Sequence, residues 1–213
     1  MNEVVIAYLH GTMVHADFSQ SLLFMCMASE TPISAVVALA SGPNLSTGRN
    51  MACRLFLTQH QSPWLFMCDT DMVLSLDTLD RLIATADPVE RPVLGGFCMK
   101  RDLDETVTPT LFKFVSDRYG GLMPAPYPQY PENTVMRVEG TGAACLLIHR
   151  SVLEAVEKET GDRAAPWFRE TDCAMPGQLM GEDLTFCLRC ASAGIPIHVH
   201  TGIKVGHVKT QII

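Results

Sequence analysis

Short apolar runs alternate with helical patterns along the first hundred residues, and this order constrains the fold more than any other feature. The runs are rich in β-branched residues and lie at 4–9, 34–39, 64–68 and 93–99. Between them, apolar residues recur with a helical period over 17–27, 46–61 and 75–85. Strands that alternate with helices form a doubly wound, mostly parallel sheet. The first half of the chain is therefore predicted to be an α/β unit.

The second half follows a different pattern. Residues 119–134 contain a glycine pair followed by four closely spaced prolines, which disfavour both helix and central strand. We expect a long loop or an edge excursion there, and a second loop at 160–181. The remaining segments predict a small antiparallel part, with strands at 135–148 and 195–200 and helices at 151–158 and 182–193. No repeat or linker-like segment divides the chain, so a single domain is predicted.

Composition excludes several other classes of protein. With 213 residues, 47% of them hydrophobic, the chain can bury a sizeable core, which excludes intrinsic disorder. No apolar run approaches the roughly 20 residues that cross a bilayer, and the first residues lack a basic signal-peptide region. We therefore expect a cytoplasmic protein with eight reduced cysteines. The Cys187/Cys190 pair has the spacing of a metal or redox site, but a buried helix face is the favoured interpretation.

Two carboxylates follow a buried strand, in the segment Asp69-Thr70-Asp71. Two charges at such a place repel each other and lose hydration unless a cation or hydrogen-bond donors compensate them. In open α/β sheets, ligands bind at the carboxyl ends of the strands. Hard oxygen ligands at alternating positions suit Mg²⁺ or Mn²⁺ that bridges a diphosphate. A turn or a helix cap explains the same residues, and both interpretations stay open on this motif alone.

Two further motifs follow in the second half of the chain. Gly181-Glu182-Asp183 opens a predicted helix, where acidic residues interact favourably with the helix dipole. Gly206-His207 follows the last predicted strand, and a lone histidine is more often structural than a ligand. The informative feature is the order of the three motifs along one chain, because chance produces the whole set much less readily than each part.

Together, Arg49-Asn50 and the segments 64–72, 181–188 and 205–207 resemble the GT-A glycosyltransferases. More narrowly, the chain resembles the small family-2-like enzymes of bacteriophages and bacteria, and the resemblance covers nearly the whole chain. It implies a single GT-A domain over 1–213. In that domain, residues 1–118 form the nucleotide-sugar-binding half, and 119–213 form the acceptor side and complete the metal site.

The resemblance also implies roles for individual residues. Asp69 and Asp71 match the DxD motif, and with His207 they are the implied ligands of Mn²⁺ or Mg²⁺. Asp69 would also contact the nucleotide-diphospho-sugar, most simply a UDP-sugar. The other implied donor-binding residues are His10, Gly11, Thr12, Arg49 and Lys209.

Asp183 matches the general base of inverting members, and Glu182 would help to hold the acceptor. A helix N-terminus favours the ionised carboxylate that a base requires. Gly140-Thr141-Gly142 either lines the substrate site or marks a close backbone approach. Trp167-Phe168 and the proline-tyrosine loop are either acceptor-side elements or aromatics that pack back on the domain.

Three kinds of acceptor remain possible: a hydroxymethyl-pyrimidine in DNA, a protein such as a virion protein, and a glycan. A phage-encoded enzyme would act in the host cytoplasm. The net charge of −7 gives no general attraction to nucleic acid, so DNA would need a local basic groove, for example at Lys100-Arg101 or Arg137. One alternative function is a nucleotidyltransferase, although residues 10–15 lack the glycine-rich, basic signature of that class. A non-catalytic sugar-nucleotide-binding protein is another, and the complete acidic set disfavours it.

Overall fold

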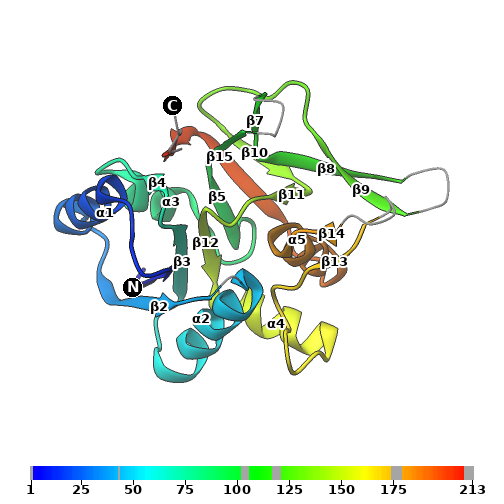
Figure 1. Cartoon of the computed structure of the whole chain (residues 1–213), viewed down its shortest axis with the longest axis horizontal. Coiled ribbons are helices and arrows are strands. Elements are labelled where there is room, and N and C mark those ends of the chain that lie inside the picture. The colour runs from blue at the N-terminus through cyan, green and yellow to red at the C-terminus, as the bar shows by residue number, and fades with distance from the viewer. Residues whose placement is uncertain (1, 43, 102–105, 117–120, 174–178, 209–213) are drawn as a thin grey trace.

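The computed structural model describes residues 2–42, 44–101, 106–116, 121–173 and 179–208. Its centre is a seven-stranded sheet in the order β10-β15-β5-β12-β3-β1-β2 (Figure 1). The strands along this order are β10 (Val135–Val138), β15 (Ile197–Lys204), β5 (Val93–Phe97), β12 (Cys145–His149), β3 (Trp64–Asp69), β1 (Val4–His10) and β2 (Ile33–Ala40).

The direction of the strands confirms the mostly parallel α/β sheet. β1 is parallel to both β2 and β3, and β15 is parallel to β5. β12 runs antiparallel between β3 and β5, and β10 runs antiparallel to β15 at the edge. Five strands therefore share one direction, and their carboxyl ends meet at one edge of the sheet.

Helices cover both faces of this sheet and bury a separate apolar core on each (Figure 1). One face carries α1 (Ala16–Ala28) and α3 (Thr78–Thr85); the other carries α2 (Leu45–Gln59), α4 (Arg150–Thr160) and α5 (Glu182–Ser192). Asn44 caps α2, because its side chain accepts a hydrogen bond from Thr47 N at 3.0 Å. Cys187 and Cys190 are free and lie on the buried face of α5, which confirms the helix-face interpretation.

Four small antiparallel sheets extend the domain among the described residues. β8 (Leu111–Ser116) pairs with β9 (Leu122–Pro126) and β11 (Gly140–Thr141); β6 (Met99–Arg101) pairs with β7 (Val107–Pro109); β4 (Met72–Val73) pairs with β16 (Gly206–His207); β13 (Thr171–Asp172) pairs with β14 (Leu179–Met180). β9 lies within the predicted proline-rich excursion and is an outer strand, where a proline does not interrupt a ladder. Within the predicted excursion, residues 122–126 thus form an edge strand, and residues 127–134 form an irregular loop.

The fold brings the predicted motifs to the carboxyl edge. Leu9 of β1 lies opposite Asp69 of β3, so the loop after His10 and the acidic motif are neighbours. The β4–β16 pairing places His207 opposite Met72, one residue after Asp71. Within the described ranges, no helix has the length and apolar composition that crossing a membrane requires.

Candidate active site

A buried arginine of α2 connects three segments of the chain at this edge. Arg49 donates to Asp69 Oδ1 at 2.8 Å, to Glu182 Oε1 at 3.1 Å and to Ala143 O at 3.5 Å. Its side chain is only 4% exposed. Burial alone would lower the pKa of Arg49, but the nearby carboxylates, Asp69 first, more than offset this and leave it raised. The guanidinium is therefore a permanent charge that fixes two acidic side chains.

Glu182 and Asp69 both contact Arg49, which their sequence motifs did not predict. Glu182 is predicted to hold the acceptor, but its side chain is 12% exposed and one carboxylate oxygen binds Arg49. Asp69 is predicted as a metal ligand, and its Oδ1 also faces Arg49. A third of the Asp69 side chain stays exposed, at 34%. Asp69 can thus still meet a ligand, whereas Glu182 mainly anchors the start of α5 to α2.

Asp183 and Asp69 line the same cavity, which has a volume of about 470 Å³. Asp183 is partly buried, and its Oδ1 accepts a hydrogen bond from Leu184 N at 2.7 Å. Burial, and secondarily the charge of Glu182, raise the pKa of Asp183 to about 6. The helix N-terminus was expected to favour ionisation, but desolvation outweighs it here. At neutral pH the group is mostly ionised and still basic enough to take a proton.

The rest of the cavity wall combines apolar and polar groups. It comprises Lys100, Thr108, Thr110, Phe112, Pro124, Pro126, Gly142, Ala143, Ala144, Gly181 and Leu184. A Cβ on Gly142 would lie 3.5 Å from Asp183 Oδ2, so this glycine leaves the approach to the carboxylate open. A Cβ on Gly140 would lie 3.0 Å from Leu184 Cδ2, which is a close backbone approach. Gly140 thus fits the close-approach interpretation, and Gly142 lines the cavity.

Asp71 and His207 form a second pair of contacting side chains at the site. His207 Nε2 lies 2.8 Å from Asp71 Oδ2, and His207 Nδ1 lies 2.9 Å from the carbonyl oxygen of Met99. Because a carbonyl only accepts, Nδ1 carries a proton, and Nε2 is the ring nitrogen that faces Asp71. The 2.8 Å contact is a hydrogen bond when Nε2 carries a proton, and without that proton Nε2 and Oδ2 both offer lone pairs to a cation. Metal-binding histidines are oriented by the same kind of hydrogen bond from the other ring nitrogen.

Two of the three predicted metal ligands are thus in contact, and the third faces Arg49. Across the described residues, no three His, Cys, Asp or Glu side chains meet as a complete metal site. Mg²⁺-type ions are commonly held by one or two protein carboxylates together with substrate phosphates. The donor set of Asp71 and His207 is compatible with such a shared site.

The remaining predicted donor-binding residues lie in the first loop and at the C-terminal end. His10 ends β1, and its Nδ1 donates to Gly11 O at 2.7 Å. Gly11 and Thr12 are exposed beside the acidic edge. Lys209 lies outside the described residues.

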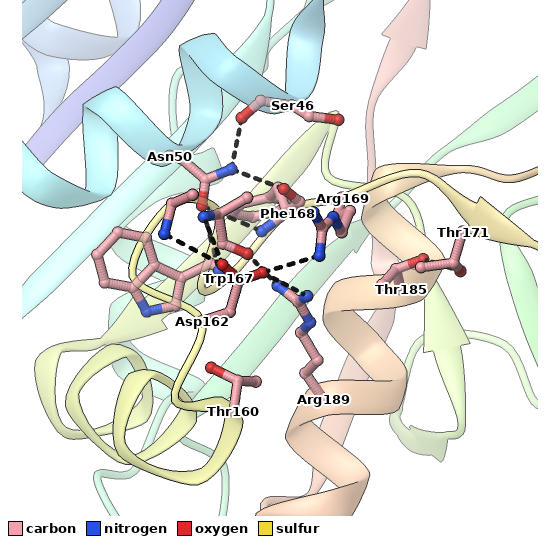
Figure 2. Close-up of polar contacts among 12 residues, drawn as sticks. Ser46, Asn50, Thr160, Asp162, Trp167, Phe168, Arg169, Thr171, Thr185 and Arg189 are labelled. Atoms are coloured by element: carbon pink, nitrogen blue, oxygen red, sulfur yellow. Dashed lines mark hydrogen bonds and ion pairs between the residues drawn. The ribbon is translucent and has the colours of Figure 1, made fainter.

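Asn50 is a site-supporting residue to which the sequence assigned no role (Figure 2). Its Oδ1 accepts from the backbone N–H groups of Trp167 and Phe168 at 3.1 and 3.3 Å, and its Nδ2 donates to Phe168 O and Ser46 O, both at 2.6 Å. Trp167 and Phe168 are fully buried, so they pack back on the domain rather than face an acceptor. We call the hydrogen bonds between Asn50 and residues 167–168 the Asn50 clamp. Its only signal in the sequence is that Asn50 is next to Arg49.

Figure 2 also shows how the loop before this clamp is held. Asp162 accepts from the N–H groups of Ala164 and Ala165, both at 3.1 Å, and from Arg169 and Arg189 at 3.1 and 3.4 Å. These contacts tie the loop to α5, the helix that carries Asp183. The first part of the predicted 160–181 loop is therefore attached to the last turn of α5.

No protein-family model and no curated protein matches this sequence, whereas solved structures match its fold. GalNAc-T7 in a structure with UDP, GalNAc and Mn²⁺ has a TM-score of 0.59 and 10% identity, over 98% of this chain and 43% of that one. The catalytic domain of Drosophila beta1,4galactosyltransferase 7, in complex with xylobiose, has a TM-score of 0.56 and 12% identity, over 99% and 72%. This chain has a GT-A-like fold.

The same fold also occurs outside the glycosyltransferases. The inositol-1-phosphate CTP transferase from T. maritima has a TM-score of 0.53 and 10% identity, over 98% of this chain and 89% of that one. The fold is thus shared by nucleotide-sugar glycosyltransferases and a CTP-using nucleotidyltransferase. At these identities the reaction has to be argued from the site itself.

Proposed function

We propose that this chain is a divalent-metal-dependent glycosyltransferase that moves a sugar from a nucleotide-diphospho-sugar to a hydroxyl acceptor. The observation that carries the proposal is the shared cavity of Asp69 and Asp183, with the Asp71–His207 pair at the same edge. One part of this site suits a diphosphate and its cation, and the other suits a proton acceptor. The likeness to GalNAc-T7, solved with UDP and Mn²⁺, supports a UDP-sugar as the donor.

Asp71 and His207 would hold the cation, together with the phosphates of the donor. When bound, Mn²⁺ or Mg²⁺ neutralises the negative charge on the departing nucleoside diphosphate. Lys100 lines the cavity that Asp69 shares and adds a positive charge beside the donor. The loop of His10, Gly11 and Thr12 would contact the nucleotide, because it follows β1 next to Asp69.

Asp183 would act as the general base. The acceptor hydroxyl loses its proton to Asp183, its oxygen forms the new bond to the anomeric carbon, and the bond from that carbon to the diphosphate oxygen breaks. A pKa of about 6 suits this role, because proton transfer is most efficient when the pKa of the base lies near the working pH. A base that activates the acceptor directly predicts inversion of the anomeric carbon.

Arg49 and Glu182 would position the catalytic groups without touching the acceptor. The charge of Arg49 opposes the rise in the pKa of Asp183 that burial and Glu182 cause. Its hydrogen bond to Asp69 orients the carboxylate that faces the cavity. We therefore assign Glu182 to the support of Arg49 rather than to the acceptor. The acceptor stays open among a hydroxymethyl-pyrimidine in DNA, a protein and a glycan.

A nucleotidyltransferase is the second candidate, and the likeness to the CTP transferase favours it. The two functions release different products: a glycosyltransferase releases a nucleoside diphosphate, whereas a nucleotidyltransferase that uses a nucleoside triphosphate releases pyrophosphate. A non-catalytic sugar-nucleotide-binding protein would bind the donor and release neither.

The test is a thermal-shift screen of UDP-, GDP- and other nucleotide sugars with and without Mn²⁺. A ligand that binds only the native state raises the melting temperature with its concentration and affinity. We expect one class of nucleotide sugar to stabilise the protein in a Mn²⁺-dependent way, and Asp71→Ala to abolish that dependence. Asp17→Asn is the control, because Asp17 is exposed on α1. Stabilisation by nucleoside triphosphates alone would favour the second candidate.

A further inference from the structure

The edge strand β2 is unusually unprotected. It has the sequence ISAVVALA, with no charged residue and no proline, and it pairs on one side only, with β1, in the part of the chain that the structure describes. The register irregularity is confined to its first residues, so most of the strand is regular. Such an edge presents a row of unpaired backbone N–H and C=O groups, which is a template for a further strand.

The other outer strands are protected in the ways that proteins commonly use. β10, at the opposite end of the central sheet, has four residues and includes Arg137. β9, the outer strand of the β11-β8-β9 sheet, contains Pro124 and Pro126, which offer no N–H group. Short length, charge and proline all discourage edge-to-edge pairing. β2 has eight residues and none of these devices, which suggests that its edge is occupied in solution.

The surroundings of β2 are apolar as well. On the α2 side, a pocket of about 440 Å³ lies along the end of the strand and has no charged lining residue; it is formed by Leu39, Ala40, Ser41, Gly42, Asn44, Thr47, Gly48, Met51 and Leu55. Met51 is 52% exposed there, and Val36 of the strand itself is 49% exposed. A strand added to an edge gains affinity from backbone hydrogen bonds and specificity from such pockets.

Charge indicates which partner fits. The chain carries a net charge of −7, so two copies repel each other over most surfaces. The β2 edge and the pocket beside it are uncharged, so neither the strand nor the pocket lining brings like charges together on self-pairing. An antiparallel pair related by a two-fold axis uses the same surface on both copies.

We propose that a second copy of this chain pairs with β2 edge to edge, which joins the two central sheets into one continuous sheet. Antiparallel pairing reverses one sheet relative to the other. The two carboxyl edges, and with them the two candidate active sites, then face opposite ways. The beginning of each β2 strand lies beside the apolar pocket at the end of the other. This proposal does not depend on the proposed catalytic function.

The experiment is sedimentation velocity from about 1 to about 100 µM, a range that brackets a micromolar dissociation constant. We expect a dimer at the upper end of the range for the wild type, and a monomer throughout for Val36→Lys. The matched control is Val89→Lys, because Val89 is 75% exposed and lies away from this edge; it should dimerise like the wild type. A monomeric wild type, or a Val36→Lys variant that dimerises equally well, would overturn the proposal.

Hydrogen exchange of the wild type gives a second readout that needs no variant. Dilution from the dimeric to the monomeric range should accelerate exchange within residues 33–40 and leave β3, at the centre of the sheet, unchanged. Equal exchange of β2 at both concentrations would contradict pairing at this edge even if the protein dimerises.

Discussion

Replacing Asp183 by asparagine should make the protein more stable while it removes the proposed base. Burial and the charge of Glu182 raise the pKa of Asp183 from 3.8 to about 6, so the folded structure disfavours the ionised carboxylate. Asparagine has the same shape and keeps an oxygen that can accept the hydrogen bond from Leu184 N. The substitution therefore removes an unfavourable charge and preserves the local geometry.

The size of the effect follows from the difference in pKa. A rise in the pKa of Asp183 of about 2 corresponds to about 3 kcal/mol of folding free energy at a pH where the carboxylate is ionised in both the folded and the unfolded protein. Since Asp183 is only partly buried, screening by solvent reduces this to about 2 kcal/mol. For a domain of this size, that amounts to a rise in melting temperature of about 4 to 8 °C.

The sign of the pH dependence is fixed by linkage. Between about pH 4 and 6, the folded protein keeps a proton on Asp183 that the unfolded chain has lost, so the wild type loses stability as the pH rises. The gain of Asp183→Asn should thus be absent below about pH 4 and complete above about pH 7. Melting curves of both proteins across this range test it. Asp172→Asn, at an exposed position, should melt like the wild type throughout. Equal melting temperatures of Asp183→Asn and the wild type at pH 7.5 would refute the reasoning.

Three further predictions concern the support of the site and its chemistry. Arg49→Met leaves the mostly buried Glu182 and the partly buried Asp69 without their cation and should cost about 3 to 5 kcal/mol in urea unfolding. Arg54→Met, which breaks a half-exposed pair with Glu157, should cost under about 1 kcal/mol. Similar losses in the two variants would contradict the central place of Arg49. Asn50→Ala removes three hydrogen bonds from the 167–168 segment and should red-shift the emission of buried Trp167; an unchanged spectrum would show that these hydrogen bonds are dispensable. The transferred sugar should invert at its anomeric carbon, as followed by NMR of the product, and a retained configuration would remove Asp183 as the direct base.

Much of the fold could be predicted because local patterns determine it. β1, β3 and β5 are apolar runs between helical patterns, and their order alone indicates a parallel sheet. The position of β12 between β3 and β5 could not be predicted, because strand neighbours are set by packing across the whole chain. β12 is as apolar as β3 and β5, the two strands beside it, so its sequence does not show that it runs antiparallel to them.

The proximity of the candidate site residues could be predicted in part for the same reason. The Asp71–His207 contact agrees with the motif order, since both residues follow strands that end at one edge. The contacts of Arg49 with Glu182 and of Asn50 with Trp167 join α2 to distant segments, and no local pattern encodes them. Burial likewise decides the pKa of Asp183, which helix position alone predicted in the opposite direction.

The most direct test of the central claim is to identify what the protein releases from nucleotide sugars. Wild type, Asp71→Ala and Asp183→Asn are incubated with the donor found by thermal shift, Mn²⁺ and a mixture of hydroxyl acceptors. Release of nucleoside diphosphate by the wild type, strongly reduced in both variants, is the predicted result. Release of pyrophosphate from nucleoside triphosphates instead, or a rate of diphosphate release that neither substitution changes, would contradict it.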